Sequence, residues 1–137
     1  MKEILPGILT WPWFSERHGY DFNGWFVRKN GVTVDDDLEH GAKVGPFTVI
    51  DAHGKSPGEI ALHWPERRLL LVGDACVGKP PGALALLPPK VIDDLPALLQ
   101  TIKRLGQLDV ETLLLGDGAP VLTGGSAALR ALAGSFP

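Results

Sequence analysis

The chain has 137 residues, of which 45% are hydrophobic and 21% charged, and its formal net charge is −3. This length suits one domain with its own core, and the composition is that of an ordinary globular protein. The negative net charge argues against nucleic acid as a partner. No apolar run reaches the ~20 residues of a membrane span. A single cysteine excludes an internal disulfide framework. We therefore expect one cytoplasmic domain over residues 1–137, with neither a nucleic-acid nor a membrane partner.

The first quarter of the chain predicts strands. Glu3–Thr10 and Trp25–Val34 have the apolar and β-branched composition of short strands. Between them, the aromatic segment Trp11–Phe14 contains a proline and predicts a loop, which could form a contact surface or cover a sheet edge or the core. Asn30 and Gly31 predict a hairpin turn, because both residues tolerate a positive φ.

The rest of the chain mixes strands and helices. Four apolar segments predict strands: Phe47–Ile50, Glu59–Trp64, Leu69–Val72 and Val110–Leu115. Pro65–Arg68 predicts a turn that joins the second and third of them into a hairpin. Helices are predicted over Lys90–Leu105 and Ser126–Leu132.

The predicted helices carry boundary signals of their own. Pro96 indicates a kink in the first helix or a later start, and Gly106 indicates its end. Thr123 and Ser126 are both candidate N-caps of the second helix. The order of elements favours a sheet with helices outside it.

Residues Gly73–Lys79 follow an apolar strand with the glycine spacing of a phosphate-binding loop. Such a loop continues with a serine or threonine and a helix whose amide groups face the phosphates. Here Pro80 and Pro81 follow, which removes two of those donors. We therefore reject a nucleotide site.

Three other motifs occur in an informative order. A tight turn, Gly54–Gly58, separates two predicted strands, an apolar strand then ends in Gly73-Asp74, and a later strand ends in Gly116-Asp117-Gly118. In this order and spacing the chain resembles the metallo-β-lactamase superfamily, which has a Gly-His-Thr-Pro-Gly-Ser turn, a strand ending in Gly-Asp and a Gly-His-Gly.

The resemblance implies a fold and a site. The fold is α+β, a shortened αββα sandwich of the metallo-β-lactamase type. In the family, the turn histidine binds zinc, the aspartate bridges two metals and the last histidine is a ligand. Lys55, Asp74 and Asp117 stand at these three positions.

The departures from the family pattern concern the metal. The motif His-x-His-x-Asp-His is absent, since the four histidines are His18, His40, His53 and His63. The segment that carries it in the family is also missing. We expect either a deletion or an omitted internal segment near residues 34–38, and a chain that compensates by forming a homodimer or by rebuilding its sheet.

Two hypotheses about the site follow. Lys55 could lie between Asp74 and Asp117 and supply the charge of the lost metal, or each of the three could be an ordinary turn residue. The first hypothesis predicts a non-catalytic binding or vestigial module with no catalytic residue, no confident metal ligand and no cofactor. The alternative is a metal-dependent hydrolase with a non-standard ligand set, in which zinc or iron would need histidines from an unseen segment.

Overall fold

The computed structural model describes the backbone of residues 2–15, 20–27 and 38–137, and the side chains of this part except those of Leu5 and residues 9–27. A three-stranded sheet, in the order β1-β2-β3, comes first along the chain. Its strands are β1 (Lys2–Leu5), β2 (Ile8–Ser15) and β3 (Tyr20–Val27). β2 is antiparallel to both neighbours.

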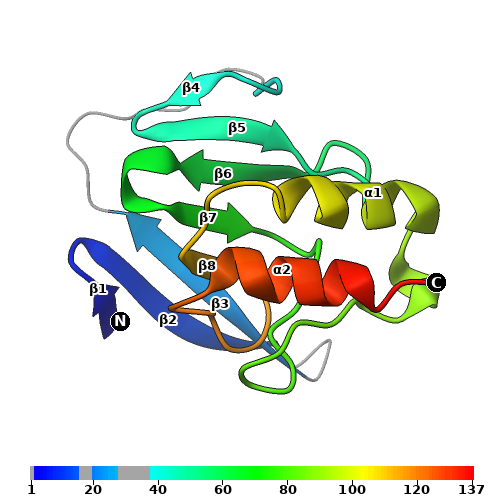
Figure 1. Ribbon diagram of the computed structural model, residues 1–137. Helices are drawn as coiled ribbons and strands as arrows, with labels where there is room; N and C mark the ends of the chain where they lie inside the picture. Colours follow the sequence, from blue (N-terminus) through cyan, green and yellow to red (C-terminus); the bar gives the residue numbers. More distant parts are fainter. Residues whose placement is uncertain (1, 16–19, 28–37) are drawn as a thin grey trace.

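The second sheet has five strands in the order β4-β5-β6-β7-β8, and it forms the centre of the molecule (Figure 1). They are β4 (Lys43–Val44), β5 (Phe47–Asp51), β6 (Ile60–Trp64), β7 (Leu69–Val72) and β8 (Thr112–Leu115). The first four are antiparallel, and β8 runs parallel to β7. Because β7 and β8 are parallel, the residues that follow them emerge at the same edge of the sheet.

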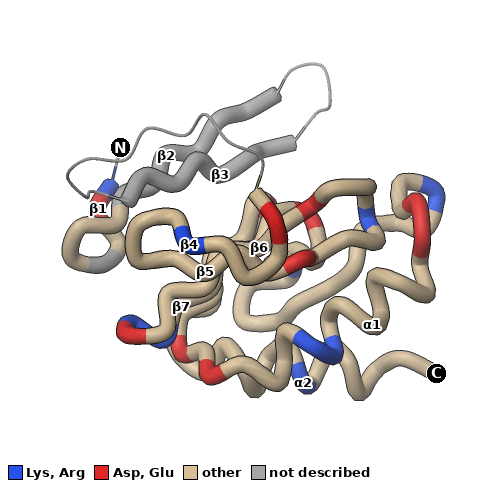
Figure 2. Tube along the Cα trace, turned by 90° about the horizontal axis from the view of Figure 1, so that it is seen from above, with Lys and Arg blue, Asp and Glu red and all other residues tan. Residues whose placement is uncertain are grey.

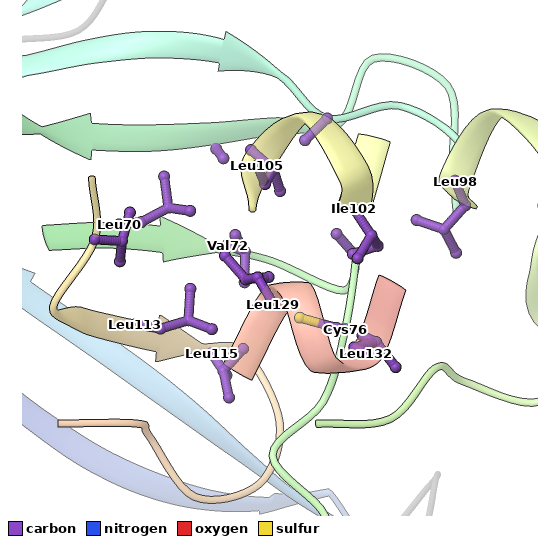
Figure 3. Packing of buried hydrophobic residues seen from close by; sticks show 14 residues of the cluster. Leu70, Val72, Cys76, Leu98, Ile102, Leu105, Leu113, Leu115, Leu129 and Leu132 are labelled. Atoms are coloured by element: carbon purple, nitrogen blue, oxygen red, sulfur yellow. The ribbon is translucent and has the colours of Figure 1, made fainter. Parts of the chain in front are cut away.

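Two helices, α1 (Leu95–Leu105) and α2 (Gly125–Gly134), lie against one face of this sheet (Figure 1). In Figure 3, side chains of both helices point toward those of β7 and β8, with the sulfur of Cys76 among them. The labelled residues are Leu70, Val72, Cys76, Leu98, Ile102, Leu105, Leu113, Leu115, Leu129 and Leu132. This cluster is the main core, and it fixes the strand ends that bear the candidate site.

The opposite face of the sheet has a smaller core, in which Ile8 of β2 packs with Leu69 and Leu114. Successive residues of a strand point to opposite faces, so Leu70 and Leu113 serve the helical core while their neighbours serve this one. The described part of the chain thus has a helical layer and a sheet whose second face is packed by the N-terminal strands. The predicted α+β fold, with helices outside a central sheet, is confirmed.

Most of the predicted elements are confirmed, and β7 has the predicted bounds. α1 begins at Leu95, so the predicted later start is correct and the predicted kink is not. Asp94 is the N-cap, and its Oδ1 accepts from the N–H of Ala97 at 3.0 Å. Pro96 stands in the first turn of the helix, where a proline costs no hydrogen bond. A short 3-10 helix, Pro89–Val91, occupies the predicted first turn.

Three predictions are wrong. The predicted strand Glu3–Thr10 is instead two antiparallel strands, β1 and β2, with a turn at residues 6 and 7. The aromatic segment Trp11–Phe14 belongs to strand β2, where Pro12 pairs with Asn23 of β3. The N-cap of α2 is Gly124, and the Ser126 hydroxyl instead accepts from the N–H of Val110 at 2.7 Å.

The predicted hairpin turn at Asn30-Gly31 and the junction near residues 34–38 fall mainly on residues 28–37, which lie outside the described part. In the described part, no helix combines the length and apolar character needed to cross a membrane. Figure 2 shows lysine or arginine and acidic residues of both signs at several separate places along the coloured part of the trace.

Candidate functional site

Lys55 lies in the turn between β5 and β6, and helix α1 holds this turn in place. The carbonyl oxygens of Gly54 and Lys55 accept hydrogen bonds from the backbone N–H groups of Asp94 (2.8 Å) and Asp93 (3.1 Å). Gly54 has a φ of +135°, and a Cβ there would lie 2.4 Å from the backbone nitrogen of Leu98. Only glycine allows this approach, which brings Lys55 to the ends of the central strands.

Asp74 follows β7 and forms the ion pair with Lys55 that the sequence predicts. The Lys55 Nζ lies 3.5 Å from the Asp74 Oδ2, and the two side chains are 22% and 35% exposed. Glu59, the residue before β6, joins them: its Oε1 accepts from the backbone N–H of Asp74 at 3.1 Å.

The carboxyl group of Glu59 has an unusual environment. Burial raises the pKa of Glu59. The hydrogen bond from the Asp74 backbone N–H opposes this rise, the negative charge of Asp74 adds to it, and the charge of Lys55 opposes it. Its second oxygen, Oε2, is buried and has no hydrogen-bond partner within the described residues. Glu59 is therefore a second carboxyl group beside Lys55 and Asp74, and its pKa is raised.

Asp117 follows β8 and pairs with a different lysine. The Lys79 Nζ lies 2.9 Å from the Asp117 Oδ1 and 3.1 Å from its Oδ2. The Asp117 side chain is only 8% exposed, whereas that of Lys79 is 52% exposed. The hypothesis that Lys55 alone serves both aspartates is thus corrected, because each aspartate has its own lysine.

Sequence reasoning missed Glu59 and Lys79 as members of the site. Glu59 follows the motif turn directly, so its place at the strand start carried a signal that could have been used. Lys79 was considered only as part of a nucleotide-binding loop, and the structure has no helix directly after it. Its contact with Asp117 joins residues 38 positions apart, which no local pattern encodes.

The residues of this site do not fit the metal that the resemblance implies. Zinc and related ions need three or more N, O or S ligands at about 2.0–2.3 Å. The described part of the chain contains no group of three His, Cys, Asp or Glu side chains placed to hold a metal. The two aspartates face ammonium groups, which repel a divalent cation instead of coordinating it.

Histidines of the described part lie outside this site. The His53 Nδ1 is 2.6 Å from the Asp51 Oδ2, and the Arg104 Nη2 is 3.4 Å from the same oxygen. Partial burial raises the pKa of Asp51, but the hydrogen bond and charge of His53 outweigh it and leave this pKa lowered. The hydroxyl of Thr101 donates to the His53 carbonyl at 2.8 Å, so this cluster connects α1 to the end of β5.

The positions of His40 and His63 indicate structural roles for both. The His40 Nδ1 accepts from the backbone N–H of Asp51 at 3.1 Å, and His63 lies in β6 opposite Thr48 and Leu70. The fourth histidine, His18, lies outside the described residues. None of the three described histidines contacts Asp74 or Asp117.

Two further features carry no chemistry of their own. Burial raises the pKa of the Cys76 thiol to about 12, which makes it a poor nucleophile. A cavity of about 380 Å³ lies beyond the opposite end of β8, next to the N-terminus of α2. Its arginines are already engaged, Arg68 with Asp109 at 2.8 Å and Arg130 with the Gly106 carbonyl at 3.1 Å.

Comparison with known families agrees with the fold and the motif order. The sequence profile described as "Metallo-beta-lactamase superfamily" matches residues 29–136. The chain therefore belongs to the metallo-β-lactamase superfamily, and the resemblance found in the sequence is confirmed. A search of curated proteins finds no match.

Several solved structures are similar to this chain. The crystal structure of TTHA1623 in a di-iron-bound form is 29% identical, with a TM-score of 0.54, over 75% of this chain and 50% of that one. A β-lactamase domain protein from Burkholderia ambifaria is 18% identical, with a TM-score of 0.50, over 76% and 33%. A metallo-β-lactamase family protein from Thermus thermophilus, TTHA1429, is 23% identical, with a TM-score of 0.49, over 80% and 35%. The matched region thus spans half or less of each of these proteins.

Proposed function

We propose that this chain is a metallo-β-lactamase-like module with a degraded metal site, and that it acts as a non-catalytic binding module or persists as a vestige of an enzyme. The observation that carries this proposal is the ion pair between Lys55 and Asp74, with 3.5 Å between the Nζ and the Oδ2. An ammonium group stands where the family has a neutral imidazole ligand.

The chemistry of the lysine supports this proposal. A metal ligand must offer a lone pair, and a protonated amine has none to offer. Asp74 keeps the position of the family's metal-bridging aspartate, but its charge is already compensated by Lys55. A hydrolase of this family needs the metal to activate water, so a site closed by an internal ion pair has lost the reactive group.

A second candidate is a metal-dependent hydrolase with a non-standard ligand set. The observation that favours it is the similarity to TTHA1623, which has been solved in a di-iron-bound form and is 29% identical. For this candidate, Asp74 and Asp117 would remain ligands, and histidines from elsewhere would complete the site.

Elemental analysis and hydrolysis assays on the purified protein test these alternatives. We expect well under one equivalent of zinc or iron per chain, and no hydrolysis of ester, lactam or phosphodiester substrates above the rate in buffer. Asp74→Ala is the matched variant, and it should change neither result. Near-stoichiometric metal that is lost in Asp74→Ala would instead establish the hydrolase.

A further inference from the structure

Lys79 has no counterpart in the motif comparison, yet it makes the closer of the two lysine–aspartate contacts at the site. Its ammonium group lies within 3.1 Å of both oxygens of a carboxylate whose side chain is 8% exposed. A buried carboxylate with no partner is costly, so this contact compensates a charge that water reaches poorly.

The backbone places Lys79 beside the end of β8. The N–H of Gly78 donates to the Asp117 carbonyl at 3.0 Å, and the N–H of Ala119 donates to the Gly78 carbonyl at 2.9 Å. A Cβ at Gly78 would lie 1.9 Å from the carbonyl oxygen of Ala119. The two segments therefore lie as close as glycine permits, and the side chain after Gly78 is held near Asp117.

The two aspartates occupy equivalent places on neighbouring strands. Val72 and Leu115 are paired in the parallel register of β7 and β8, and each aspartate comes two residues later. The N–H of Gly116 donates to the Gly73 carbonyl at 3.4 Å, which continues this pairing toward the aspartates. Adjacent strands are about 4.8 Å apart, so two carboxylates at this edge repel each other unless cations lie between or beside them.

We propose that Lys55, Asp74, Asp117 and Lys79 form one four-charge network that closes the ends of β7 and β8, in which the two lysines supply the positive charge that a metal supplies in other family members. This inference rests on the proposed function, because it requires that no metal occupies the site. It goes further by assigning a role to Lys79 and by coupling the two ion pairs.

The network makes a prediction that two independent ion pairs do not. With one lysine removed, the other can still compensate part of the charge of both aspartates. With both removed, two adjacent carboxylates remain with no cation. The loss of stability in the double variant should therefore exceed the sum of the losses in the single variants.

Thermal unfolding of wild type, K55M, K79M and K55M/K79M tests this coupling, with K103M on the exposed face of α1 as the matched control. We expect each single variant to lower the Tm by about 5 °C, the double variant to lower it by clearly more than the sum, and K103M to change it by less than about 2 °C. Strictly additive losses, or a K79M loss equal to that of K103M, would overturn the network.

If K55M/K79M does not fold, a fourfold variant tests whether the lysines are needed only to compensate the two aspartates. K55M/D74N/K79M/D117N removes all four charges and leaves side chains of similar size. We expect its Tm to lie above that of K55M/K79M, or the fourfold variant to fold where the double variant does not, because neither Asp74 nor Asp117 then remains as a carboxylate without a cation. A fourfold variant no more stable than the double variant would show that the charges do not interact. The metal content of the wild-type protein is measured independently of these unfolding experiments, so the proposed function and the network can fail separately.

Discussion

Glu59 shows how one side chain reports on the electrostatics of the site. Burial raises the pKa of its carboxyl above the ordinary value of 4.5. A carboxyl group with a raised pKa in the folded state binds its proton more tightly there than in the unfolded chain. Glu59 therefore favours folding below this pKa and opposes it progressively as the pH rises through it.

Glu59→Gln should accordingly become more favourable as the pH rises. Glutamine can still accept from the N–H of Asp74 but carries no charge. We expect the difference in the free energy of unfolding, variant minus wild type, to increase between about pH 4.5 and pH 8, measured by urea unfolding. Glu66→Gln, on the exposed turn before β7, is the control. If the difference in the free energy of unfolding between Glu59→Gln and wild type does not change with pH, the raised pKa of Glu59 is contradicted.

Cys76 gives a second prediction at the scale of one residue. Its thiol is buried in the helical core, and burial raises its pKa to about 12. We expect a thiol reagent at pH 8 to modify the native protein at least about a thousandfold more slowly than the urea-unfolded chain, because reaction requires opening of the core. Similar rates in both states would show that this core is accessible.

At the scale of elements, the contact between the β5–β6 turn and α1 determines where Lys55 lies. Gly54 and Gly58 both have positive φ, but a Cβ would collide with the backbone of Leu98 at Gly54 and would meet nothing within 4 Å at Gly58. Gly54→Ala should cost at least about 3 kcal/mol, because something must shift to admit the Cβ, whereas Gly58→Ala should cost about 1 kcal/mol for its backbone strain alone. Equal losses in urea unfolding would show that the turn does not depend on this contact.

The elements that sequence predicted best are those with strong local signals. β7 is an apolar run closed by a turn on one side and glycine on the other, and its predicted bounds are those observed. The start of α1 was correctly predicted as late because Pro96 restricts the helix to begin near it. The strand at Trp11–Phe14 was missed because Pro12 was taken as a break, although the pairing with β3 accommodates it.

The site was predictable only as far as family motifs extend. The motif order located Lys55, Asp74 and Asp117, and the pairing of Lys55 with Asp74 follows from it. Which lysine reaches Asp117 depends on how the segment after β7 crosses the end of β8. That path is tertiary, since it is set by the close approach of Gly78 to Ala119.

The sequence predicts unpaired strands at the sheet edges, and the two edges of the five-stranded sheet, β4 and β8, differ from this prediction. β4 is only two residues long, and the outer edge of β8 is bridged where Leu113 and Val121 exchange hydrogen bonds of 2.7 and 2.9 Å. Both devices limit pairing with another chain through an edge. The expected deletion near residues 34–38 and its compensation by a homodimer or a rebuilt sheet remain predictions.

At the scale of the whole molecule, Ile8 connects the two sheets. Its side chain has no exposed surface and packs against Leu69 and Leu114. Ile8→Ala should lower the free energy of unfolding by about 2–4 kcal/mol, comparable with Leu114→Ala, while unfolding remains a single transition. A loss below about 0.5 kcal/mol, or a separate first transition, would show that the N-terminal sheet is not part of the same cooperative unit.

The homodimer remains a prediction of the sequence, and sedimentation equilibrium measures it. A dimer has twice the chain mass of 14.7 kDa and a Tm that rises with protein concentration. A single-chain mass at every concentration would contradict the dimer.

The central claim is that lysine ammonium groups, and not a metal, compensate Asp74 and Asp117. The most direct measurement is a crystal structure of the wild-type protein grown with zinc and iron, with anomalous difference maps collected at both absorption edges. The account predicts no anomalous peak between the two aspartates, with Lys55 at Asp74 and Lys79 at Asp117. A strong peak coordinated by these carboxylates, with the lysines turned away, would contradict it.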